Sequence, residues 1–172
     1  MAYLKVRHKV NQGFSGGKYH DDNSYRDVIN YIMQPGKTPS GYIGGMAVNL
    51  CNAVYEMEKL SEYFGQNHGV RLRHMIIAFE DSELCNTKSA SLRVAYKAAH
   101  HIAQFYGKEY QIVYAVHEDT GTVHIHFVMN TTNYITGRKY NGSKRDLYQF
   151  IDHIENCSVL SGIKVKLEKD LN

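Results

Sequence analysis

Apolar and polar residues alternate along some stretches of the chain and recur at helical spacing along others. Alternation with a period of two predicts strands over 3–10 and 72–79 and a two-stranded hairpin over 110–130. Helical spacing of apolar residues predicts helices over 24–33, 49–65, 88–106 and 144–157. Because a hairpin requires antiparallel pairing, we predict an α+β fold, with a central antiparallel β-sheet of about five strands and helices packed mainly on one face.

The predicted hairpin carries three histidines within the stretch AVHEDTGTVHIHFVMN, residues 115–130. With the turn at residues 119–121, His117 lies opposite His124, and the period of two places His126 on the same face. Side chains opposite each other have Cβ atoms roughly 4.5–5.5 Å apart, so three imidazoles can converge on one ion. A single histidine on such a strand is usually an ordinary polar residue, but three together favour a metal site with open coordination positions. Ligand type alone favours zinc or another transition ion over magnesium.

Length and composition limit the class of protein. With 172 residues, 43% of them hydrophobic, we expect residues 1–172 to form a single domain. The charged ending KVKLEKDLN suggests that this domain is the first part of a longer protein. There is no apolar run of membrane-spanning length, no signal-peptide core and no CxxC pair among the three cysteines. These features predict a cytoplasmic protein without a disulfide scaffold.

The net charge of +3 is mild, but basic residues are clustered. The first predicted strand has a basic face, and a second cluster follows the hairpin and comprises Arg138, Lys139, Lys144 and Arg145. Fourteen tyrosines, which can stack on unpaired bases, accompany these clusters. The composition therefore permits single-stranded nucleic acid as a partner without requiring it.

A metal beside DNA raises the question of what attacks the phosphodiester. Metal-activated water would hydrolyse it, whereas a side-chain nucleophile would form a covalent intermediate. The helix over 24–33 offers Tyr25 and Tyr31. Spacing does not choose between them, and most tyrosines are packing residues.

Several segments resemble conjugative relaxases of the MOB-P class, which are mobilisation nucleases within the histidine-hydrophobe-histidine endonucleases. The resemblance spans residues 24–163 and rests on VINYIMQPGKT, GGMAVNLCNAVYEM, RLRHMIIAFEDSE, YAVHEDTGTVHIHFVMNTTNYITGRKY and DLYQFIDHIENCSVLSGI. Its most specific pieces are the His-x-Asp then His-x-His pattern, followed by Asn130 and a Thr-Gly-Arg/Lys turn, and the tyrosine in its Tyr-Ile-x-x-Pro-x-Lys-Thr setting.

The resemblance implies a palm-like fold shared with relaxases and rolling-circle initiators, and a role for each matching residue. Tyr31 matches the nucleophile, and the hairpin histidines match the ligands of a divalent ion, commonly Mg²⁺ or Mn²⁺. Asp119 matches an acidic residue expected to orient a ligand through a hydrogen bond. Lys37 and Thr38 match a loop near DNA.

The implied function is that of a relaxase, which nicks one strand at the origin of transfer of a plasmid or integrative conjugative element. The product would be a 5′-phosphotyrosyl adduct that can be resealed. The expected partners are single-stranded or hairpin DNA at the origin, accessory relaxosome proteins and a coupling protein.

Some positions depart from the usual pattern, and other functions stay open. Relatives commonly have Ser-Phe at residues 78–79 and Asn-Pro-Glu-Lys-Thr at 34–38, where this chain has Ala-Phe and Gln-Pro-Gly-Lys-Thr. His74 also recurs at this place in relatives, and a core or substrate-groove role is as open for it as a catalytic one. The alternatives are a rolling-circle initiator or single-tyrosine transposase, which place the tyrosine after the histidines, a non-catalytic DNA-binding module, and a metallohydrolase of small molecules.

Overall fold

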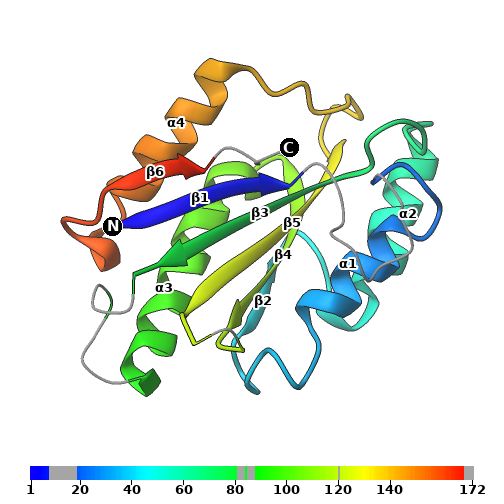
Figure 1. Ribbon diagram of the computed structural model, residues 1–172. Helices are drawn as coiled ribbons and strands as arrows, with labels where there is room; N and C mark the ends of the chain where they lie inside the picture. Colours follow the sequence, from blue (N-terminus) through cyan, green and yellow to red (C-terminus); the bar gives the residue numbers. More distant parts are fainter. Residues whose placement is uncertain (8–18, 81–83, 85–87, 120, 169–172) are drawn as a thin grey trace.

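The computed structural model describes residues 1–7, 19–80, 84, 88–119 and 121–168 (Figure 1). Lys9 of the predicted basic strand and Thr120 of the hairpin turn lie outside these residues. A six-stranded sheet runs through the described part in the order β2-β4-β5-β3-β1-β6. Its strands are β1 (Ala2–Arg7), β2 (Ile43–Met46), β3 (Leu72–Phe79), β4 (Tyr110–His117), β5 (His124–Asn133) and β6 (Val165–Glu168). All neighbours pair antiparallel except β1 and β6, which are parallel.

The α+β class is therefore confirmed, and the long strands lie close to their predicted positions. The sheet gains β2 and β6, two short edge strands of four residues each that the pattern did not predict. In β2, glycine suits close contact with the neighbouring strand, because a Cβ on Gly44 would lie 2.3 Å from the Tyr114 ring of β4.

The helices cover both faces of the sheet, whereas the pattern predicted them mainly on one (Figure 1). Helices α3 (Lys88–Gly107) and α4 (Lys144–Glu155) bury the larger apolar cluster on one face. Helices α1 (Ser24–Ile32) and α2 (Ala53–Tyr63) bury a second cluster on the other. The central strands show the reason: all ten residues of β5 are buried, so both of its faces need a covering layer. None of the described helices is long and apolar enough to span a membrane.

Buried polar contacts fix α1 against α2 and the sheet. The Tyr25 hydroxyl lies 2.8 Å from the Arg71 carbonyl, 2.8 Å from Asn130 Oδ1 and 2.9 Å from Ser61 Oγ. The Asn130 amide in turn donates to the Met57 carbonyl of α2 at 3.2 Å. Because a buried polar group that loses its partner is costly, this network holds α1 in one position over β5.

Candidate metal centre and nucleophile

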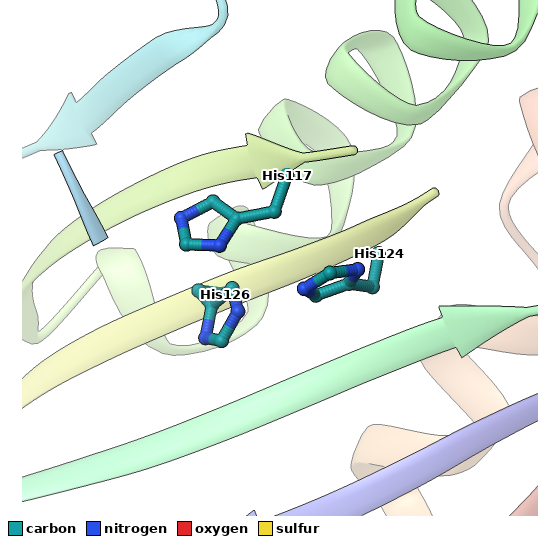
Figure 2. Close-up of side chains that lie close together, drawn as sticks. All are labelled: His117, His124 and His126. Carbon is teal, nitrogen blue, oxygen red and sulfur yellow. The ribbon is translucent and has the colours of Figure 1, made fainter. Parts of the chain in front are cut away.

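The hairpin brings its three histidines together as its pattern predicts. His117 ends β4 and pairs directly with His124, which begins β5, and His126 follows two residues later on the same face. Figure 2 shows the three imidazoles converging from these two strands. One nitrogen from each lies within 4.8 Å of the others, and all three residues are buried. The described residues thus form a compact set of three ligand atoms.

Hydrogen bonds decide which nitrogens face the centre. His117 donates from Nε2 to the Ile32 carbonyl at 2.8 Å, and His124 donates from Nδ1 to the Thr122 carbonyl at 3.1 Å. A carbonyl only accepts, so each of these nitrogens carries the proton of a neutral ring. The lone pairs are left on His117 Nδ1 and His124 Nε2.

Two nitrogens at the centre are buried without a hydrogen-bond partner among the described residues, namely His117 Nδ1 and His126 Nε2. Buried polar atoms are nearly always satisfied, so unpaired nitrogens that face a common point indicate a missing partner. A cation bound by three neutral imidazoles satisfies them. The residues present therefore fit a divalent metal ion.

Burial keeps the cluster uncharged. Desolvation lowers the pKa of His117, His124 and His126 below their usual value. Desolvation, together with the positive charge of Arg7, also lowers the pKa of the adjacent His74 to about 3. Neutral imidazoles are the form that binds metal, so no proton must be displaced from the lone pairs near neutral pH.

Tyr31 is the tyrosine of α1 that faces the histidines. Its ring centroid lies 5.8 Å from that of His117 and 5.7 Å from that of His126. Lys37 Nζ lies 4.2 Å from the centroid of the same ring. Tyr25, the other tyrosine of this helix, is 1% exposed, its hydroxyl is occupied by the network described above, and burial raises its pKa to about 12. Of these two tyrosines of α1, Tyr31 therefore lies beside the histidines and Tyr25 lies in the buried network.

Asp119 lies beside the cluster but is not close enough for the expected hydrogen bond. Its Oδ1 is 3.8 Å from His124 Nε2, beyond hydrogen-bond distance, and its Oδ2 is 3.5 Å from Lys37 Nζ. The carbonyl of Thr122, not Asp119, orients the His124 ring. Asp119 instead places a negative charge between His124 and Lys37.

Of the six predicted DNA contacts, Lys37 lies half-buried beside Tyr31, and the other five divide into exposed and structural groups. The exposed side chains are those of Arg138, Lys144 and Arg145. Thr38 is 3% exposed and donates to the Ile32 carbonyl at 2.7 Å, so its burial disagrees with a DNA contact. Lys139 donates to the carbonyls of Gln66, at 2.8 Å, and His68, and burial lowers its pKa. These two side chains hold loops together.

Two residues with no catalytic role predicted from the sequence lie on the same face of the sheet as the histidines. Arg7 pairs with His74, and His74 lies two residues from Ile76, the partner of His126, so both residues face the histidine side of the sheet. A hollow near the start of β3 is lined by Arg7, Tyr19, Arg73, Lys139, Tyr140 and Lys144, whereas His124 pairs with Ala78 near the opposite end of that strand. The resemblance already marked His74, but its place beside the histidine cluster requires knowing how β3 pairs with β5.

Comparison with protein families gives a match over most of the chain. The family model described as relaxase, MobA/VirD2-like, nuclease domain matches residues 31–157, which include Tyr31, Asp119 and the three histidines. A search of curated proteins finds no match to the chain.

Proposed function

Since the chain belongs to the family of relaxases with a MobA/VirD2-like nuclease domain, we propose that it nicks one DNA strand at an origin of transfer with Tyr31 as the nucleophile. The family supports relaxase-type DNA nicking in general. The observation that carries the finer proposal is the position of the Tyr31 ring, 5.7–5.8 Å from the rings of two of the three hairpin histidines. A nucleophile for phosphoryl transfer must lie beside the group that neutralises the phosphate charge. The Tyr31 ring lies beside the histidines that would hold such a group.

The reaction is a transesterification. The Tyr31 hydroxyl oxygen forms a bond to phosphorus, the bond from phosphorus to the 3′-oxygen breaks, and the phenol proton ends on that 3′-oxygen. The products are a 5′-phosphotyrosyl adduct and a free 3′-hydroxyl. One phosphoester replaces another, so the reverse step reseals the strand.

His117, His124 and His126 would hold a divalent ion through Nδ1, Nε2 and Nε2 respectively. Such an ion supplies Lewis-acid stabilisation of the charge on the phosphate oxygens. We infer Mg²⁺ or Mn²⁺, with Mn²⁺ better matched to three imidazoles. The set of protein ligands is open, which leaves positions for substrate oxygens.

Lys37 and Asp119 form the polar edge of the site. Lys37 Nζ lies between the Tyr31 ring and Asp119, at 4.2 Å from the ring centroid and 3.5 Å from Oδ2. An ammonium group there can approach both a phosphate and the developing charge on the phenol oxygen. We assign Lys37 to the phosphate beside the nick, and Arg138, Lys144 and Arg145 to more distant phosphates of single-stranded or hairpin DNA. Accessory relaxosome proteins and a coupling protein complete the proposed set of partners.

The test is the covalent adduct. The protein is incubated with Mn²⁺ and a random-sequence library of single-stranded oligonucleotides labelled at the 3′ end, because the adduct retains the 3′ fragment. We expect a labelled, denaturation-resistant protein band with the wild type and with Tyr63→Phe, whose ring is 82% exposed, and none with Tyr31→Phe. An undiminished band with Tyr31→Phe would contradict the assignment of the nucleophile. Loss of Mn²⁺ binding in His124→Ala, measured by calorimetry, tests the metal ligands separately.

A further inference from the structure

Three buried side chains form a hydrogen-bonded row that ends on a proposed metal ligand. His74 is the diagonal neighbour of His126, because Ile76 pairs with His126 and His74 with Val128. His74 Nε2 lies 2.8 Å from His126 Nδ1, and His74 Nδ1 lies 3.1 Å from the Tyr19 hydroxyl oxygen. Tyr19, His74 and His126 are 3%, 4% and 2% exposed. Water therefore does not compete for these bonds.

His126 needs a side-chain partner because of its place in the sheet. His117 and His124 lie at strand ends, where the carbonyls of Ile32 and Thr122 are free to accept their ring protons. Ile32 ends α1, and the last carbonyls of a helix lack helical partners. His126 instead lies between β4 and β3, paired with Ala115 on one side and Ile76 on the other. Backbone groups beside it belong to the strand ladders, so a side chain must receive its proton.

The direction of the hydrogen bond between the two rings decides whether His126 can bind an ion. A neutral imidazole carries one proton, on either Nδ1 or Nε2. If His74 donated to His126 Nδ1, the proton of His126 would occupy Nε2, the buried nitrogen that faces the other ligands. If His126 donates from Nδ1, its Nε2 keeps the lone pair. His74 then accepts at Nε2 and donates from Nδ1 to the Tyr19 hydroxyl oxygen.

We propose that His74 is a positioning residue that accepts the Nδ1 proton of His126, and so fixes the tautomer and ring orientation in which His126 Nε2 binds the metal. This proposal rests on the proposed function, since it assumes that the hairpin histidines bind an ion. Of the three ligands, His126 alone has an orienting partner that substitution can remove, because the other two are held by backbone carbonyls.

The test compares two substitutions of His74 by their effect on metal affinity. His74→Gln retains an acceptor oxygen near the position of Nε2, whereas His74→Phe keeps a ring but offers no acceptor. Mn²⁺ affinity is measured by calorimetry for the wild type, both variants and His126→Ala, with circular dichroism as the check of folding. We expect His74→Phe to weaken Mn²⁺ binding about 10–100-fold, as removal of a ligand's orienting partner usually does, and His74→Gln to stay within several-fold of the wild type.

The outcomes distinguish the proposed role of His74 from the proposed metal site. Wild-type affinity in a folded His74→Phe, or an equal loss in the Gln and Phe variants, would overturn the role of His74 and leave the metal site standing. A wild-type protein that binds no Mn²⁺ would overturn the metal site, and the role of His74 with it. In that case, the adduct assay with Tyr31→Phe still tests the nucleophile.

A second measurement needs no variant and therefore holds even if His74→Phe does not fold. Two-bond ¹H–¹⁵N correlation spectra of the wild type, loaded with diamagnetic Zn²⁺, report the protonation of each ring nitrogen. We expect a proton on His126 Nδ1 and none on His74 Nε2. A proton on His74 Nε2 in the Zn²⁺-loaded protein would reverse the direction of the bond and overturn the proposal.

Discussion

The imidazole of His117 donates a hydrogen bond from Nε2 to the backbone carbonyl of Ile32, at 2.8 Å. This bond joins the end of β4 to the end of α1, and Ile32 directly follows Tyr31. The hydrogen bond therefore has two effects. It leaves His117 Nδ1 free for an ion, and it fixes the distance between the histidine cluster and the turn of helix that carries the proposed nucleophile.

The buried Thr38 hydroxyl donates a second hydrogen bond to the Ile32 carbonyl, at 2.7 Å. Thr38→Val keeps the shape of the side chain and removes the donor. We expect the free energy of unfolding to fall by about 0.5–1.5 kcal/mol, measured by urea denaturation. Affinity for single-stranded DNA, measured in a Tyr31→Phe background, should not change. A large loss of DNA affinity at unchanged stability would show that Thr38 contacts DNA after all.

Tyr25 and Tyr31 should respond to the same substitution in opposite ways. Tyr25→Phe removes a buried hydroxyl that contacts Ser61, Asn130 and the Arg71 carbonyl, so we expect a loss of about 1–3 kcal/mol in unfolding free energy. The variant should still form the DNA adduct. Tyr31→Phe should abolish the adduct in a protein that remains folded. Loss of the adduct in a folded Tyr25→Phe would contradict this division of roles.

What could be predicted from the sequence was local. The pairing of His117 with His124 was predictable because a short turn joins their strands and fixes the register. Strand β3 and helix α3 were likewise visible in their own residues, with bounds of 72–79 and 88–107 in the structure. The residues alone left Tyr25 and Tyr31 equivalent, and the resemblance to relaxases was needed to choose Tyr31.

What could not be predicted depends on contacts between distant segments. Gly44 and Gly45 indicate a loop by their own propensities, and only pairing with β4 makes them part of a strand. The contact of His74 with His126 joins residues 52 positions apart, and no turn specifies their register. The covering of both sheet faces is a property of the assembled sheet.

The burial of His153, on helix α4, leads us to expect that stability depends on pH. Its ring stacks on His101 at 4.8 Å, its Nε2 donates to the His101 carbonyl at 3.0 Å, and burial lowers its pKa below the ordinary value of 6.5. The unfolded chain therefore binds this proton at a higher pH than the folded chain, so stability falls as the pH drops below about 6.5. His153→Gln retains a donor and removes the titration.

We expect the wild type to lose more unfolding free energy than His153→Gln between pH 7.5 and pH 5, each measured by urea denaturation with EDTA present. The exposed His68 provides the matched control, His68→Gln, whose pH profile should follow that of the wild type. Parallel profiles for the wild type and His153→Gln would show that this ring does not contribute.

We expect Lys37 to contribute to the salt dependence of DNA binding. Its ammonium group lies at the edge of the site between Tyr31 and Asp119, in contact with the ring of the proposed nucleophile. Each phosphate contact on a single strand contributes about 0.7 to the slope of log K against log salt concentration, because counterions are released. In a Tyr31→Phe background, Lys37→Gln should lower the magnitude of that slope by about 0.7, measured by fluorescence anisotropy with a labelled oligonucleotide.

Lys59→Gln is the matched control, because Lys59 is exposed on α2 and pairs with Glu62. Equal slopes for the two variants would remove Lys37 from the phosphate contacts. A smaller slope for Lys37→Gln alone would place a phosphate beside Tyr31, where the transesterification requires it.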